Sequence, residues 1–299
     1  MPPISSSPGA APANDANGSQ AVRTATHVAA PFWRVLATSG YGLWAWLGMA
    51  LVLGRPDGRS GTLVPLAAGL VLAGFGLVLA CLPGRGAAHD WYGWQPYRDS
   101  RPTRAALLAF VTYLPMLAVA GLARGDNDFW ATRLAGAALA LCSLASLAYN
   151  HYDHRRRWLR PAPSSSSQQF PLRRVLFAGY AGGLCLWAIT VAQGQQGSPF
   201  LGMPWLAVLL GLAVVTWVTE AGAWRSLGRR RPARTAALRS ARWVSVLLAY
   251  AVPALAIMLT MWIHTPLLTA AVVAAPSCLL GRWLEQRQFA AVRRNDVLR

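Results

Sequence analysis

The feature that most constrains this chain is a series of eight apolar segments, each about 20 residues long. A helix needs about 20 apolar residues to cross the hydrocarbon core of a bilayer. Lipid cannot satisfy open backbone groups, and the segments lack the alternating pattern of barrel strands, so each is expected to be a helix. The segments are Phe32–Leu53, Gly61–Leu82, Ala105–Leu122, Trp130–Tyr149, Val175–Val191, Leu201–Gly222, Val244–Ile263 and Pro266–Trp283. The sequence therefore predicts an all-α integral membrane protein, a bundle of about eight transmembrane helices.

Composition supports the membrane class. The chain is 55% hydrophobic and 13% charged, whereas soluble domains are about 25% charged. Its net charge of +18 would suit a soluble nucleic-acid-binding protein, but the charges lie in loops between the apolar segments. We therefore expect membrane lipids, and no nucleic acid, as partners of the basic loops, including residues 228–234.

Two regions differ in composition. Residues 1–30 are rich in Ser, Pro, Ala, Gly and Asn and contain no apolar run, which is typical of a disordered tail. Residues 31–299 hold all eight apolar segments, so they are predicted to form one transmembrane domain. Small residues recur inside two segments, at Ala135–Ala138 and Ala181–Gly183. These runs either permit close helix contact or reflect compositional bias.

The arginines predict an orientation. All 28 basic residues are arginine, a usage typical of a GC-rich, bacterial genome. Twenty-four of them lie at the N-terminal side, in the loops after even-numbered segments or in the C-terminal tail. Only Arg55, Arg59, Arg124 and Arg133 lie on the other side. Because basic loops stay in the cytoplasm, both termini are predicted to be cytoplasmic, in a bacterial inner membrane.

Residues that bind metals or haem are not grouped inside the segments. The four cysteines include no CxxC pair, and no histidine lies at the centre of a segment. Clustered thiolates are required for zinc and iron–sulfur sites, so no covalent cofactor and no metal are expected. Cysteines without such spacing are predicted to be small buried residues. No carboxylate lies mid-segment, and Glu220 lies near the end of the sixth, which argues against a proton-coupled transporter.

The loop after the second segment has the most unusual composition. Residues 82–104 place Trp91 and Trp94 among His89, Asp90 and several arginines. Aromatic and arginine side chains suit the lipid headgroup layer. The same side chains would suit the rim of a pocket for an aromatic, carbonyl-bearing ligand such as a quinone.

Several stretches resemble the membrane-anchor subunit of the dimethyl sulfoxide reductase family of molybdoenzymes. Ser39–Leu43 and Ala45–Gly48 are similar to the family's first span, and the aromatic loop is similar to the stretch after its second span. The other similar stretches, in the family's order, are Tyr149–Trp158, Ala236–Trp243 and Gly281–Leu284. The resemblance extends over about residues 35–294.

The resemblance implies a function. Such anchors hold an iron–sulfur subunit and a molybdopterin catalytic subunit on the membrane, and they oxidise menaquinol or ubiquinol without a redox cofactor of their own. The quinol-linked histidine of the family falls near Leu82 or Pro83, and its acid falls at Ala105, so neither proton-exchanging group is present. A non-redox protein, such as a small transporter or a scaffold, is therefore the alternative.

A quinol site in this chain would need other residues. Quinol oxidation releases two protons, and His89 and Asp90 are predicted to accept them. Trp91 and Trp94 offer ring faces for the quinone head. Arg85 and Arg104, which stay charged, are predicted to complete the site.

The arginine distribution leads to a topology prediction. Reporter fusions at Arg299 and near Arg59 should report cytoplasmic and periplasmic locations, respectively, because basic residues remain on the cytoplasmic side. Periplasmic reporter activity at Arg299 would contradict the predicted orientation.

Overall fold

The structure, a computed structural model, describes residues 14–54, 58–81, 110–123, 129–158, 170–194, 198–230, 238–263 and 268–294. Within these ranges the chain forms helices and no strand. The helices are α1 (Asn14–Val52), α2 (Arg59–Cys81), α5 (Tyr113–Leu122), α6 (Trp130–Trp158), α7 (Phe170–Ala192), η2 (Pro199–Leu201), α8 (Met203–Arg230), α10 (Arg239–Val246), η3 (Leu247–Ala251), α11 (Val252–Ile263) and α12 (Leu268–Arg294). Each predicted apolar segment is helical over its described residues, apart from Leu53, Thr112 and Gly202.

The N-terminal helix is longer than the first apolar segment. α1 begins at Asn14, inside the segment of residues 1–30 that the sequence assigns to a tail. Residues 1–13 lie outside the described part of the chain.

Within the described residues, five helical stretches are long and apolar enough to cross a membrane. They are Arg34–Val52, Trp130–Ala148, Leu172–Ala192, Met203–Ser226 and Arg239–Ile263. α2 and α5 contain shorter apolar stretches, Arg59–Phe75 and Tyr113–Leu122. The structure thus supports a helical membrane protein with five candidate spans, fewer than the eight transmembrane helices that the sequence predicts.

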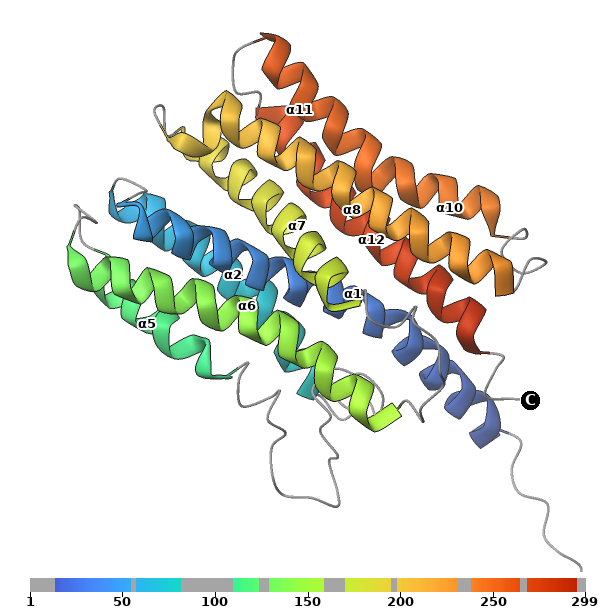
Figure 1. Cartoon of the computed structure of the whole chain (residues 1–299). Helices are drawn as coiled ribbons and strands as arrows, with labels where there is room; N and C mark the ends of the chain where they lie inside the picture. The colour runs from blue at the N-terminus through green and yellow to red at the C-terminus, as the bar shows by residue number, and fades with distance from the viewer. Residues whose placement is uncertain are drawn as a thin grey trace, which may run out of the picture.

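The helices form two groups (Figure 1). α1, α2, α5 and α6 make up the first group, and α7, α8, α10–α11 and α12 make up the second. α1 packs against α2 and α6 in its own group and against α7 and α12 in the other. In its apolar stretch 78% of the residues are buried, compared with 33% for α8. α1 is therefore the inner helix that joins the two groups.

Glycines bring α1 close to three neighbouring helices. A Cβ atom on Gly40 would lie 2.6 Å from the Ala73 backbone nitrogen in α2, and one on Gly42 would overlap the Ala178 carbonyl group in α7. A Cβ atom on Gly48 would overlap the Gly136 carbonyl oxygen in α6. Small residues allow helix backbones to approach in membranes, where van der Waals contact drives association. Three helix crossings thus depend on glycines within ten residues of α1.

The glycines on the partner helices decide whether the small-residue runs serve close helix contact or only reflect compositional bias. A Cβ atom on Gly136 would lie 2.6 Å from Leu51 Cβ, and one on Gly182 would overlap the backbone at Gly42 and Leu43. Both glycines come from the small-residue runs noted in the sequence. Of the two interpretations, close helix contact therefore holds at these two positions.

Two tryptophans of α1 add hydrogen bonds to the same crossings. Trp44 Nε1 donates to the Leu66 carbonyl of α2 at 3.0 Å, and Trp46 Nε1 donates to the Gly179 carbonyl of α7 at 2.7 Å. A buried indole N–H needs an acceptor, and these carbonyls supply it. The two bonds fix the rotation of α1 relative to both groups.

The seventh predicted segment contains a π-helical turn. η3 lies between α10 and α11, and the Val252 backbone nitrogen donates to the Leu247 carbonyl five residues earlier. Pro253 follows directly and has no N–H for the Ala249 carbonyl, so the regular pattern cannot continue there. α12 packs against this turn, and a Cβ atom on Gly281 would overlap the Ala249 backbone nitrogen.

The α1–α7 crossing can be tested with one large side chain. Gly42→Leu should lower the free energy of unfolding by about 2 kcal/mol or more, because the new side chain must separate two backbones in contact. Denaturant unfolding of the purified protein in detergent would measure the change. Gly211→Leu is the matched control, because no atom lies within 4 Å of its added Cβ. Equal effects of both substitutions would contradict the assigned role of Gly42.

Candidate functional site

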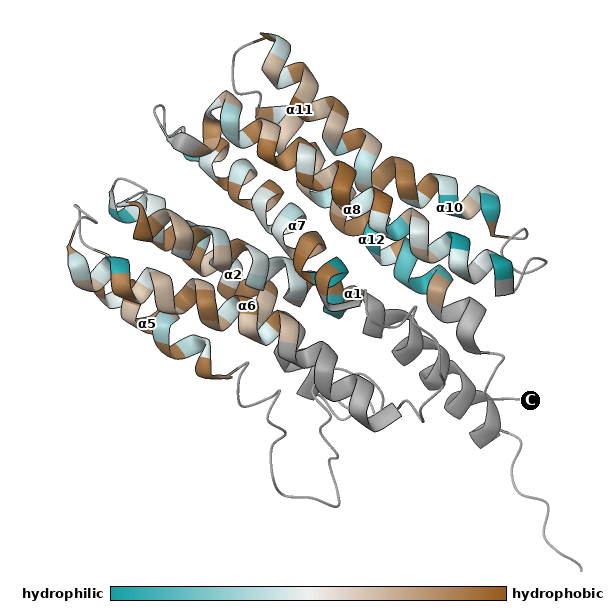
Figure 2. Cartoon of the chain, in the orientation of Figure 1, coloured by the Kyte–Doolittle hydropathy of each residue, from teal (hydrophilic) through white to brown (hydrophobic). Residues whose placement is uncertain are grey.

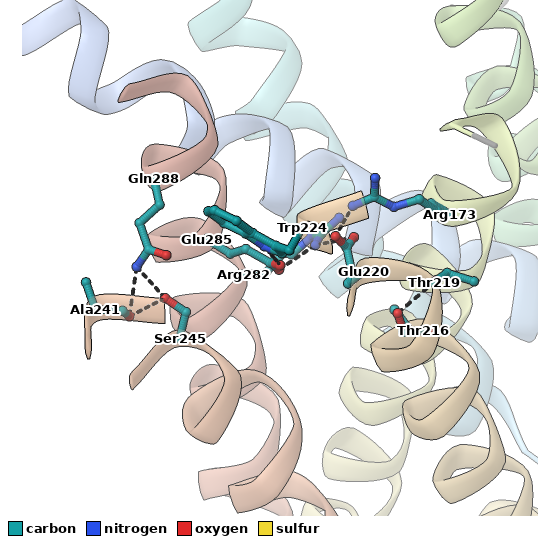
Figure 3. A network of polar contacts seen from close by, with 10 residues as sticks. All are labelled: Arg173, Thr216, Thr219, Glu220, Trp224, Ala241, Ser245, Arg282, Glu285 and Gln288. Atoms are coloured by element: carbon teal, nitrogen blue, oxygen red, sulfur yellow. Dashed lines mark hydrogen bonds and ion pairs between the residues drawn. The ribbon is translucent and has the colours of Figure 1, made fainter. Parts of the chain in front are cut away.

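Four charged side chains are buried together at one end of the second helix group (Figure 3). They are Arg173 at the start of α7, Glu220 near the end of α8, and Arg282 and Glu285 in α12. Their side chains are at most 10% exposed. We call these four residues the ion cluster. Charges within membrane helices are rare and usually mark functional sites, so the ion cluster is the candidate site among the described residues.

Arg282 connects the two carboxylates of the ion cluster. Arg282 Nη1 donates a hydrogen bond of 2.6 Å to Glu285 Oε2 and forms an ion pair with Glu220 Oε1 that lacks hydrogen-bond geometry. Arg173 Nη2 donates to Glu220 Oε2 from the opposite side. Trp224 Nε1 donates to Glu285 Oε1 at 2.8 Å. Both carboxylates therefore have cationic and hydrogen-bonding partners.

Aromatic rings surround the guanidinium groups of the ion cluster. The Arg282 guanidinium lies 4.8 Å from the ring centroid of Phe177, and that of Arg173 lies 5.8 Å from Phe289. The rings of Trp224 and Phe289 are 4.2 Å apart. Cation–π contacts strengthen when the cation is desolvated, so these rings offset part of the cost of burying two arginines.

A second polar contact holds α12 against α10. Gln288 Nε2 donates to the Ala241 carbonyl at 2.8 Å and to Ser245 Oγ at 2.7 Å. Gln288 lies one turn after Glu285 on α12. The charged and amide contacts together link α7, α8, α10 and α12 at one end of the group.

The ion cluster is neutral overall, because two arginines balance two glutamates. Burying charges is costly unless they are paired with good geometry, and the pairing here involves every charged member. The carboxylates are committed to Arg173, Arg282 and Trp224, so the arrangement suits a fixed joint between helices better than a site that exchanges protons with a substrate.

The residues predicted for a quinol site cannot be placed. Arg85, His89, Asp90, Trp91, Trp94 and Arg104 all lie outside the described residues. The described chain stops at Cys81, the last residue of α2, and resumes at Phe110.

Two of the three cysteines whose side chains are described are buried, as the sequence predicts. Cys185 and Cys278 are buried and free, and Cys142 is half-buried and free. Among the described residues, no group of three or more His, Cys, Asp or Glu side chains could hold a metal ion.

Comparison with known proteins gave no match to a family model, a curated protein or a solved structure. The assignment of a function therefore depends on the residues themselves.

Sequence reasoning did not identify the ion cluster. It treated Glu220 as a carboxylate near a segment end and did not connect it with α12. One signal was present: Glu220 and Glu285 are the only glutamates in the 299 residues, and both lie near arginine-rich helix ends. Their pairing depends on how α8 and α12 align.

Removing one charge should disrupt the ion cluster. Glu220→Gln leaves Arg173 and Arg282 facing each other without their shared anion, and loss of one partner of a buried pair costs about 3–5 kcal/mol. Denaturant unfolding in detergent should show a loss of that size. Arg59→Gln, at an exposed arginine, serves as the control and should unfold like the wild type. A Glu220→Gln protein as stable as the control would contradict a stabilising role for the ion cluster.

Proposed function

We propose that this chain is the membrane-anchor subunit of a molybdopterin oxidoreductase complex in a bacterial inner membrane. In this function eight helices span the membrane, and the chain tethers an iron–sulfur subunit and a molybdopterin catalytic subunit. It passes two electrons from each menaquinol or ubiquinol to the iron–sulfur subunit, and the two protons of the quinol are released.

One observation carries the proposal. The stretches that resemble the anchor family coincide with the helix contacts on which the fold depends. Ser39–Gly48 contains the glycines at which α1 meets α2, α7 and α6, and Gly281–Leu284 contains Arg282 of the ion cluster. A resemblance at such positions supports a common way of packing the helices, because these positions tolerate little change.

The proposed quinol site uses the loop after α2. His89 and Asp90 take the two protons, Trp91 and Trp94 hold the quinone ring, and Arg85 and Arg104 provide positive charge near its oxygens. The chain's own contribution is to bind and orient the quinol, while the electrons leave to the nearest cluster of the partner subunit.

A scaffold or small transporter without redox function is the second candidate. Leu82 or Pro83 and Ala105 occupy the positions of the family's histidine and acid, which favours loss of quinol chemistry. The paired ion cluster favours a scaffold over a transporter, because both of its carboxylates are occupied.

Purification of the chain from its native membrane would test the anchor function. Molybdenum and iron should co-purify with the tagged protein in a constant ratio to it, because the partner subunits carry both metals. Elution without either metal would contradict the anchor function and favour the non-redox candidate.

Quinol oxidation by the assembled complex would test the site. His89→Ala and Asp90→Asn should each lower turnover at least about tenfold, because a positioned proton acceptor contributes about 100-fold or more. Asp126→Asn, in the loop between α5 and α6, is the control and should keep wild-type turnover. Unchanged turnover in both test variants, at constant metal content, would leave the chain as a tether only.

A further inference from the structure

Four arginines lie at or beside the ends of two apolar stretches. The apolar stretch of α8 ends at Ser226, and that of α10–α11 begins at Arg239. Arg225, Arg229 and Arg239 are exposed, and Arg242 is half-buried. In Figure 2 hydrophilic residues gather at this end of α8 and α10. We call Arg225, Arg229, Arg239 and Arg242 the arginine patch.

The arginine patch combines charges from two helices. The Arg242 guanidinium lies 5.1 Å from the ring centroid of Trp224, which precedes Arg225 in α8. Arg225 is close enough to Arg242 for their positive charges to repel. Arg229 follows Arg225 by one helical turn, and Arg239 precedes Arg242 by three residues, so each pair shares a helix face. Such a concentration of charge favours an anion that several guanidinium groups can share.

No exposed carboxylate is available to the arginine patch within the described side chains. Glu220 and Glu285 are the carboxylates whose side chains the structure describes, and both are buried. Glu285 attracts Arg242, but its two oxygens already accept hydrogen bonds from Arg282 and Trp224. The anion that balances the arginine patch must therefore come from another molecule or from undescribed parts of the chain.

The helix face next to the patch indicates a lipid. Arg239, Trp243 and Leu247 follow one another at intervals of four residues, and all three are exposed. This face changes from charged to aromatic to aliphatic toward the centre of the span. Charged groups, indole rings and aliphatic side chains suit the phosphate layer, the interface and the acyl chains, respectively. An acidic protein segment would match the arginines and leave the aliphatic part uncovered.

We propose that the arginine patch binds one anionic phospholipid. Its phosphodiester group contacts Arg225, Arg239 and Arg242, and an acyl chain lies along Trp243 and Leu247. A zwitterionic lipid is disfavoured, because its cationic headgroup would lie among four arginines. The site belongs to the membrane domain itself, so it does not depend on the proposed redox function.

Lipid binding can be measured on the purified full-length chain by native mass spectrometry. The probe is a mixed micelle that contains phosphatidylglycerol and phosphatidylcholine with matched acyl chains. The wild type should retain one phosphatidylglycerol molecule in preference to phosphatidylcholine. The double variant Arg225→Gln/Arg239→Gln should retain it at least about fivefold less, because each arginine near an anionic surface adds to the attraction. Both positions are exposed, so the variant should fold.

The control has the same change of charge at the opposite side of the membrane domain. Arg59→Gln/Arg133→Gln should retain phosphatidylglycerol like the wild type. Equal retention of both lipids by the wild type, or an equal loss in the control, would overturn the proposal. Displacement of the lipid by excess inorganic phosphate would also overturn it, since a free anion makes no contact with the aromatic and aliphatic face of Trp243 and Leu247. Unchanged lipid binding in the Arg225→Gln/Arg239→Gln variant, with loss of a co-purifying acidic protein, would assign the patch to a protein partner instead.

Discussion

The close approach of α1 to its neighbours is the constraint on which the rest of the structure depends. Lipid tails are as apolar as leucine side chains, so little hydrophobic driving force remains between helices inside a bilayer. Association must come from close packing and from polar contacts. Gly40, Gly42 and Gly48 let α1 approach the backbones of α2, α7 and α6, and the indoles of Trp44 and Trp46 donate hydrogen bonds across two of these crossings. Because α1 belongs to one helix group and contacts the other, a change here affects both.

The second helix group is held by a different kind of contact. At one end of this group, charged and amide side chains connect α7, α8, α10 and α12 through Glu220, Arg282, Glu285 and Gln288. Such contacts are directional, since each requires a particular rotation of each helix. A buried ion pair adds little net stability compared with a well-packed apolar core, but breaking it is costly. The ion cluster therefore disfavours other helix arrangements, as a polar residue at a coiled-coil core position does.

The sequence predicted the helical state of the apolar segments, because length and apolarity decide whether a membrane segment is helical. Of the eight predicted spans, however, the described residues support five candidates. It indicated the small-residue contacts at Gly136 and Gly182, although composition alone could not separate them from bias. It did not predict that Glu220 and Glu285 would share Arg282, because that contact depends on the alignment of two helices whose glutamates are 65 residues apart in the chain. The sequence did not predict the π-helical turn, although Pro253, whose missing N–H interrupts the regular hydrogen-bond pattern, lies just after it.

The separation between helix contacts and loop residues affects how the family resemblance is interpreted. The stretches around Gly42 and Arg282 contain residues that pack helices together. Such residues indicate how the helices assemble rather than what the protein binds. The residues that would carry quinol chemistry lie in the loop after α2, where the family's histidine and acid are absent. A chain can keep the helix contacts of an anchor while its loop chemistry changes, because lipid constrains the helices and leaves the loops free to vary. The fold and the proposed redox activity are therefore separate questions for this protein, and substitutions at His89 and Asp90 test only the second.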